Sequence, residues 1–240
     1  MDEGGLLVRR AATQLLADED DMSLPTPYYD DGNGIVIYHS DCRDILPHLP
    51  KVDLVLTDPP YGIAHASNYT CETTTAQWMN TEIQHDGTTE LRDFVLSQYD
   101  EWVCFASLKV ELPICRGVLV WDKGPASGMG DLTFPWKTSY ELICINGKGW
   151  NGSRDEGVIK NHWIVTRASM GRTHPNEKPE SLIAYLLSKH PANTIIDHFM
   201  GSGTTLRAAK DLGRKCIGIE IEEKYCEIAA RRLGQEVLDL

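Results

Sequence analysis

The stretch that decides the fold is Val52-Asp53-Leu54-Val55-Leu56-Thr57-Asp58-Pro59-Pro60-Tyr61-Gly62. Its apolar part is short and nearly continuous, a pattern typical of a parallel strand that is buried on both faces. Pro59 and Pro60 end the strand, because proline cannot donate a hydrogen bond to a sheet. We therefore expect Asp58 at the carboxyl end of a strand, where ligands bind in open α/β sheets.

The residues after this strand favour a planar ligand that carries an amine. The prolines bring carbonyl groups but no N–H, so that beside the Asp58 carboxylate the backbone offers mainly hydrogen-bond acceptors. Tyr61 adds a flat aromatic face. Acceptors beside an aromatic ring suit a nucleobase with an exocyclic NH2 group, although a plain proline turn with a solvated aspartate would contain the same residues.

Length and composition predict one soluble domain. The chain has 240 residues, 42% of them hydrophobic, which is enough for a substantial core. No apolar run approaches the ~20 residues of a membrane span, and Leu6-Leu7-Val8 is too short for a signal peptide. The seven cysteines form no CxxC pair and the eight histidines form no HExxH or HxH pattern. We expect reduced thiols in a cytoplasmic protein, no membrane contact and no metal.

The formal charge of −12 argues against nonspecific coating of nucleic acid, but the charge is unevenly distributed. Residues 1–33 hold eight acidic and two basic side chains, and we expect an acidic, mobile or loosely docked leader before a domain at 34–240. Residues 147–178 hold six basic and three acidic side chains. This local excess is compatible with one contact to a polyanion and equally with a solvated surface.

Apolar segments alternate with helical patterns and predict an α/β fold with a doubly wound, mostly parallel sheet. The expected strands are residues 35–38, 52–56, 116–121, 140–145, 194–197 and 216–221. The expected helices are residues 43–49, 91–107, a helix introduced by Pro179, residues 204–212 and residues 222–238. Residues 63–90 and 148–173 look irregular, and a long irregular segment such as 63–90 is more often a functional lid than a passive connection.

A second site is predicted at Gly201-Ser202-Gly203, between an expected strand and helix, where small residues let backbone N–H groups face a ligand. Glu220, at the end of the next strand, is placed to accept hydrogen bonds from ribose hydroxyls. The third glycine of GxGxxG is absent, so S-adenosylmethionine fits better than NAD. A tight turn alone would also explain the two glycines.

The order of the elements predicts a circularly permuted sheet. The chain continues for one helix after the Glu220 strand, whereas a nucleotide-binding half-sheet needs a third strand. The remaining segment is 35–38, and placing it there brings Asp41 beside the adenine of a cofactor.

Four motifs, in this order, resemble the permuted beta class of DNA amino-methyltransferases. They are Asp58-Pro59-Pro60-Tyr61, the run from His174 to Pro179, the run from Asp197 to Thr205 and the run from Gly218 to Glu220. The resemblance covers about residues 34–235 and departs from the family at His198, where proline is usual. It implies a Rossmann-like fold, S-adenosylmethionine as the cofactor and methylation of an exocyclic amine in double-stranded DNA.

The resemblance also implies roles for individual residues. Asp58 and the carbonyl of Pro59, with Pro60 beside them, would hold the amine of a flipped-out base on which Tyr61 stacks. The implied cofactor contacts are Asp41, Cys42, Lys178, Asp197, Phe199, Gly201, Ser202, Gly203, Thr204 and Glu220. A short recognition segment around 148–173 would contact DNA through Lys148, Arg154, Lys160, Arg167 and Arg172. Trp121 and Lys123 could line the pocket.

The first residue of the proline motif points to the target base. Aspartate there resembles the adenine-N6 enzymes, whereas serine is more typical of cytosine-N4 enzymes, so we predict N6-methyladenine as the product. N4-cytosine methylation and a non-catalytic DNA-binding relative are the alternatives. Such a protein belongs with the nucleoid in the cytoplasm, and restriction–modification is its usual context. The sequence leaves open a homodimer, a cognate restriction nuclease and the recognised DNA sequence.

Overall fold

The computed structural model describes residues 25–60, 88–124, 133, 135–160 and 177–235. The strands are β1 (Tyr29–Asp30), β2 (Ile35–His39), β3 (Leu54–Thr57), β4 (Trp102–Ala106), β5 (Gly117–Asp122), β6 (Tyr140–Asn146), β7 (Val158–Lys160), β8 (Thr194–Asp197) and β9 (Lys215–Glu220). The helices are α2 (Cys42–Ile45), the 3₁₀ helix η1 (Leu46–His48), α3 (Glu90–Ser97), α4 (Glu180–Ser188), α5 (Thr204–Asp211) and α6 (Glu223–Leu233).

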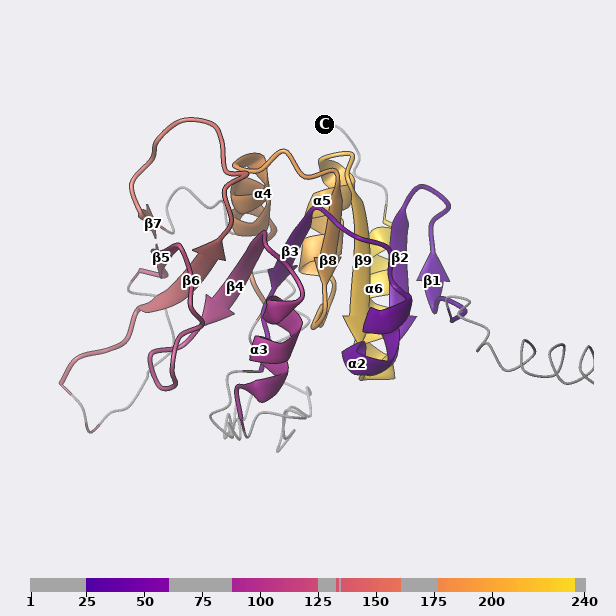
Figure 1. Ribbon diagram of the computed structural model, residues 1–240, viewed down its shortest axis with the longest axis horizontal. Helices are drawn as coiled ribbons and strands as arrows, with labels where there is room; N and C mark the ends of the chain where they lie inside the picture. Colours follow the sequence, from indigo (N-terminus) through magenta and orange to yellow (C-terminus); the bar gives the residue numbers. More distant parts are fainter. Residues whose placement is uncertain (1–24, 61–87, 125–132, 134, 161–176, 236–240) are drawn as a thin grey trace, which may run out of the picture.

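Within these residues, the nine strands form one sheet in the order β1-β2-β9-β8-β3-β4-β6-β5-β7 (Figure 1). The five strands from β2 to β4 in this order are parallel to one another. β6 runs antiparallel to both of its neighbours, and β7 is parallel to β5. The predicted α/β class with a mostly parallel sheet is confirmed, as are the six predicted strands.

The predicted permutation is also confirmed. β2 pairs with β9 in parallel, in a register that runs from Ile35 opposite Cys216 to His39 opposite Glu220. A strand near the start of the chain therefore completes the half-sheet that the glycine motif opens. β1 pairs antiparallel with the outer side of β2, so the sheet begins inside the segment 1–33 that the sequence suggested as a leader.

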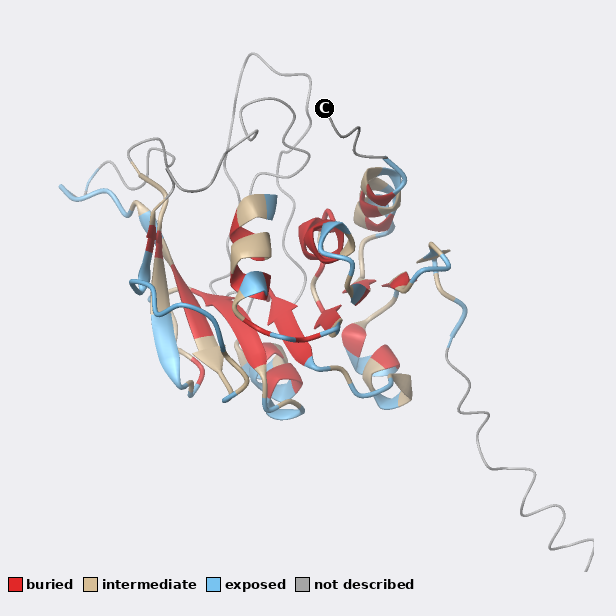
Figure 2. Ribbon diagram, turned by 90° about the horizontal axis from the view of Figure 1, so that it is seen from above, coloured by how far each residue is buried: buried red, intermediate tan, exposed pale blue. Residues whose placement is uncertain are grey.

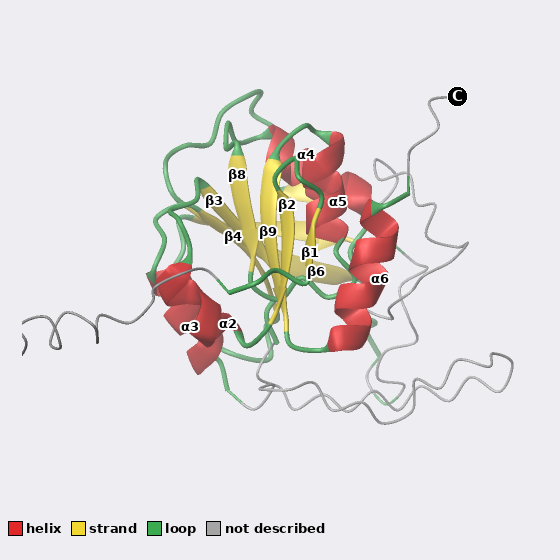
Figure 3. Cartoon of the chain, turned by 90° about the vertical axis from the view of Figure 1, so that its right-hand side faces the viewer, coloured by secondary structure: helices red, strands yellow, loops and turns green. Residues whose placement is uncertain are grey.

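Helices cover both faces of the sheet. α2 and α3 pack on one face, and α4, α5 and α6 pack on the other (Figures 2 and 3). All four residues of β3 are buried, as expected of a parallel strand that is covered on both faces. Fully burying an aliphatic side chain such as Leu54 or Val55 stabilises the fold by about 1.5–3 kcal/mol. This central strand is therefore a rigid support for the residue that follows it.

Two sequence predictions of secondary structure are wrong. The segment 91–107, predicted as one helix, divides into α3 and the strand β4. All five residues of β4 are buried, and a short continuous apolar run fits helical and strand periodicity equally well. The segment 148–173, predicted as irregular, contains β7, whose three residues pair with β5. The predicted lid at 63–90 lies almost wholly outside the described residues.

The strand order places one edge of the sheet where ligands are expected. Parallel pairing aligns the carboxyl ends of β2, β9, β8, β3 and β4. β5 and β7 end at the same edge and β6 begins there, because Asp122 pairs with both Tyr140 and Lys160. We call this the carboxyl edge and the opposite one the amino edge. The carboxyl edge is where open α/β sheets bind ligands.

Candidate active site

Asp58 follows β3 at the carboxyl edge and is held there by a buried lysine. The Nζ of Lys178 lies 2.6 Å from Oδ2 of Asp58, and the lysine side chain is 9% exposed. Lys178 comes two residues before α4, whose first turn accepts Pro179 as its N-terminal cap. The sequence predicted Lys178 as a cofactor contact, whereas the structure places its ammonium on the carboxylate of the proline motif.

The Asp58–Lys178 pair continues into a chain of alternating charges. Lys178 also lies 2.8 Å from Oε1 of Glu141, and Oε2 of Glu141 lies 2.5 Å from Nζ of Lys123. Lys178 further approaches the ring of Phe105, at 4.8 Å from its centroid. Each charge in this group has an opposite charge beside it, which buried ions require.

These contacts keep the buried groups ionised. Burial raises the pKa of Glu141, but Lys178 and Lys123 outweigh it and lower that pKa to about 2. Burial lowers the pKa of Lys178, but the carboxylates of Asp58 and Glu141 outweigh it and raise that pKa above the ordinary value. At neutral pH the group therefore presents fixed charges around Asp58.

Asp197 ends the neighbouring strand β8 and faces β3. Its Oδ1 accepts hydrogen bonds from the hydroxyl of Thr57 at 2.8 Å and from the backbone N–H of Phe199 at 3.2 Å. Burial raises the pKa of Asp197 to about 6, although hydrogen bonds from Thr205, Thr57 and Phe199 oppose the rise. The carboxylate is thus ionised at neutral pH in a nearly dry position.

Glu220 ties the glycine motif to β9. Its Oε2 accepts from the backbone N–H of Gly201 at 3.0 Å, and its Oε1 accepts from the N–H of Glu222 at 2.8 Å. Burial raises the pKa of Glu220 above its ordinary value, and these backbone hydrogen bonds oppose the rise. The predicted meeting of the glycine motif and Glu220 therefore exists in the structure.

The two glycines of the motif have different roles. A Cβ on Gly203, where φ is +80°, would lie 2.7 Å from the Cβ of Ala229, so this glycine lets α5 approach α6. A Cβ on Gly201, where φ is +50°, would meet nothing within 4 Å. The open space at Gly201, beside the carboxylates of Asp197 and Glu220, suits a ligand that bears hydroxyl groups and a positive charge. S-adenosylmethionine is such a ligand, so the residues present fit it.

The other predicted cofactor residues lie near this site with local partners. Asp41 follows β2 at the carboxyl edge, caps α2 by accepting from the N–H of Arg43 at 2.9 Å, and pairs with its guanidinium at 2.5 Å. Cys42 is buried, and burial raises the pKa of its thiol to about 12. Phe199 packs partly buried on the face of the sheet that α2 and α3 cover.

His198, which stands where the family usually has proline, is buried and neutral. Its Nε2 lies 3.3 Å from the hydroxyl of Tyr99, and the two rings meet edge to face. Burial lowers the pKa of His198 to about 3. The departure at this position therefore fills the core beside the glycine motif and adds no charge to the site.

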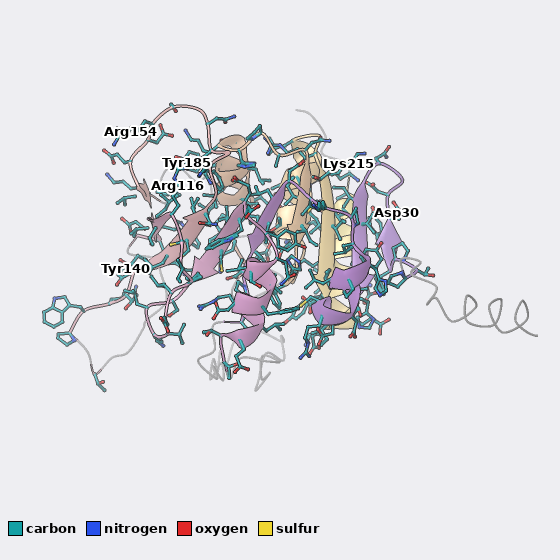
Figure 4. The ribbon with its side chains drawn as sticks, in the orientation of Figure 1. Asp30, Arg116, Tyr140, Arg154, Tyr185 and Lys215 are labelled. Atoms are coloured by element: carbon teal, nitrogen blue, oxygen red, sulfur yellow. The ribbon has the colours of Figure 1, made fainter. Side chains whose placement is uncertain are left out.

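The predicted DNA contacts divide between the two edges. Lys160 ends β7 at the carboxyl edge, on the same side of the sheet as Asp58. Lys148 follows the end of β6 at the amino edge, and Arg154 also lies at that end, away from Tyr140 (Figure 4). The structure therefore does not bring Lys148 and Arg154 to Asp58. Arg167, Arg172 and the predicted stacking residue Tyr61 lie outside the described residues.

Sequence reasoning missed Glu141, Thr57 and Arg232 as parts of the site. Glu141 carried a usable signal, since it is the one charge in the apolar strand β6. In the described parts of the chain, no group of three His, Cys, Asp or Glu residues could hold a metal ion. No helix in those parts is long and apolar enough to cross a membrane.

Comparisons with known proteins agree with this geometry. A family model described as "DNA methylase" (N6_N4_Mtase) matches residues 74–231. Type II methyltransferase M2.LlaDCHI of Lactococcus lactis subsp. cremoris is 28% identical over 251 residues, covering 87% of this chain and 92% of that protein. Type II methyltransferase M.HinfI of Haemophilus influenzae is 47% identical over 66 residues, covering 27% of this chain and 18% of that protein.

Solved structures share the fold. The M1.HpyAVI–SAM complex superimposes with a TM-score of 0.57 at 22% identity, covering 82% of this chain and 98% of that one. PvuII DNA methyltransferase, described as cytosine-N4-specific, has a TM-score of 0.56 at 17% identity, covering 86% of this chain and 88% of that one. At these identities the likeness concerns the fold.

Proposed function

This chain belongs to the DNA methylase family that the N6_N4_Mtase model describes, and from that premise we propose that it methylates the exocyclic N6 amine of adenine in double-stranded DNA. The observation that carries the proposal is the position of Asp58. The carboxylate follows a buried central strand, at the ligand-binding edge, and Lys178 fixes it. The choice of adenine rests on the aspartate that opens the proline motif.

The target amine needs activation, because conjugation with the ring makes its lone pair a poor nucleophile. Asp58 and the Pro59 carbonyl are acceptors, and acceptors aimed at the amine hydrogens favour the positive charge that develops on nitrogen as the new N–C bond forms. Preorganised groups of this kind are usually the largest single contribution to catalysis. Lys178 orients the Asp58 carboxylate before the base arrives, and Tyr61 would stack on that base.

S-adenosylmethionine, when bound, supplies a methyl group on a positively charged sulfur. We propose that Asp197 and Glu220 bind this cofactor through their buried carboxylates and that Gly201 leaves space for it. A carboxylate can accept from a ribose hydroxyl while it keeps its backbone hydrogen bond, since each oxygen has two lone pairs.

The test is the methylated base itself. The protein is expressed in a host without DNA methylation, and the digested DNA is analysed by nucleoside mass spectrometry. We expect N6-methyladenine with the parent and none with Asp58→Ala, whose melting temperature should stay near that of the parent. The exposed Asp44 of α2 provides a matched control, since Asp44→Ala should methylate normally.

Two outcomes would contradict the proposal in different ways. N4-methylcytosine without N6-methyladenine would refute the choice of base and leave the role of Asp58 intact. No methylated base at all would favour a non-catalytic DNA-binding relative. A folded Asp58→Ala variant that still methylates would remove Asp58 from the reaction.

A further inference from the structure

Arg232, near the end of α6, reaches two motifs that are far apart in the sequence. Its Nη1 donates to the hydroxyl of Thr204 at 2.9 Å and lies 3.4 Å from the hydroxyl of Ser202. Its Nη2 forms an ion pair with Glu177. The side chains of Arg232 and Glu177 are only 14% and 13% exposed, so solvent weakens the pair little.

These contacts join the cofactor loop, which we define as residues 200–204, to the residue before Lys178. Glu177 is bonded directly to Lys178, and Lys178 holds Asp58. Arg232 is thus the central member of a continuous path from the glycine motif to the proline motif. Its helix lies beside α5 and α4 on one face of the sheet (Figure 3).

Helix packing alone does not require this arginine. α5 and α6 already meet at Gly203 and Ala229, and Leu233 of α6 is buried in the core. The neighbouring Arg231 shows what an arginine does here without such a role. It is 75% exposed and pairs only within its own helix, with Glu227, among the ion pairs of the described residues.

We propose that Arg232 is a positioning residue that couples the cofactor loop to Asp58 through Glu177 and Lys178. The inference rests on the proposed function and adds to it a link between the two sites. Because Thr204 and Glu177 hold one guanidinium from two sides, a loop that becomes ordered around the cofactor also fixes the segment before α4. Couplings of this kind typically change an affinity or an opening equilibrium by 5- to 150-fold.

Hydrogen–deuterium exchange tests the coupling without any turnover. S-adenosylhomocysteine, the demethylated cofactor, is the probe, added at saturation to the full chain. In the parent, we expect it to slow exchange in the cofactor loop and, by at least about fivefold, in the first turn of α4. In Arg232→Gln, the loop should remain protected at saturation while the first turn of α4 no longer responds.

Matched variants separate coupling from a merely structural contact. Arg231→Gln should behave like the parent, because this residue touches neither motif. Arg232→Lys keeps the charge but lacks the two-sided geometry, so it should respond only partly. If Arg232→Gln does not fold, Glu177→Gln removes one partner alone and should give the same loss of response in α4.

The outcomes distinguish this inference from the proposed function. A parent that methylates DNA, with an Arg232→Gln variant whose α4 responds as in the parent, would refute the coupling alone. Loss of the response in Arg231→Gln would likewise refute it, since any change in α6 would then suffice. A parent that binds no probe and methylates nothing would refute both.

Discussion

Replacing Asp197 by asparagine should stabilise the protein while weakening its cofactor site. The side chain is 3% exposed and its carboxylate, in the described residues, accepts from Thr57 and from the backbone of Phe199. Asparagine has nearly the same shape, and its amide oxygen can accept the same hydrogen bonds. Asp197→Asn therefore removes the buried charge and little else.

The size of the effect follows from the pKa of Asp197, which burial raises from 3.8 to about 6. That difference corresponds to about 3 kcal/mol of unfolding free energy. The folded carboxyl group holds its proton more tightly than the unfolded one. Its favourable contribution is therefore complete below pH 3.8 and is lost as the pH rises through about 6. The parent bears the full cost at pH 8 and about half of it at pH 5.

Urea unfolding of the free protein at pH 8 and pH 5 measures this difference. Asp197→Asn should exceed the parent by up to about 3 kcal/mol at pH 8, and by about half as much at pH 5. Calorimetry should show weaker binding of S-adenosylmethionine, because a carboxylate that could face its positive charge is gone. A stability change that is the same at both pH values, or a loss of stability at pH 8, would refute the reasoning.

Asp53 provides the control with the opposite sign. It lies at the amino edge of the same pair of strands, where hydrogen bonds from the backbone and hydroxyl of Thr194 lower its pKa. A lowered pKa stabilises the fold above the ordinary value, and this stabilisation is lost as the pH falls through the folded pKa. Asp53→Asn should therefore destabilise the protein at pH 8, and less so in acid.

Three further changes test other parts of the site. Glu220→Ala should weaken S-adenosylmethionine binding by about ten- to a hundredfold in calorimetry, and unchanged affinity would contradict its assignment. Gly203→Ala should lower the melting temperature more than Gly201→Ala, because only the former places a Cβ against Ala229; equal losses would refute the packing argument. A triple variant should bind DNA more weakly, with a salt dependence flatter by about one unit of slope per contact, whereas a double variant at the amino edge should not, and the reverse result would move the DNA site. The triple variant neutralises Lys160, Arg167 and Arg172, and the double variant neutralises Lys148 and Arg154.

Much of the fold could be predicted because local signals agree with the final arrangement. Pro59 ends β3, and Gly213, with φ at +66°, follows α5, so both boundaries are written in single residues. The permutation followed from counting strands around Glu220. β4 escaped prediction because burial on both faces removes the alternation that identifies a strand.

The charged group around Asp58 could not be predicted in the same way. Glu141 and Lys178 are brought together by the course of β6 and the start of α4, and no local spacing records that meeting. The sequence placed Lys178 in the right region, but a motif match cannot state which carboxylate a lysine will contact. Pairings of this kind depend on tertiary structure, which is why the residues were found and their partners were not.

The pairing of β2 with β9 has a consequence for synthesis and folding. His39 and the carbonyl of Ile221, which lie 3.1 Å apart beside these strands, are 182 residues apart in the chain. At about 5–20 residues per second, a ribosome makes that length in roughly 10 to 40 s. Throughout this interval one side of β2 has no strand to pair with, and β1 protects only the other side. Topology of this kind slows folding, so the nascent chain exposes an adhesive edge for far longer than an unpermuted sheet would.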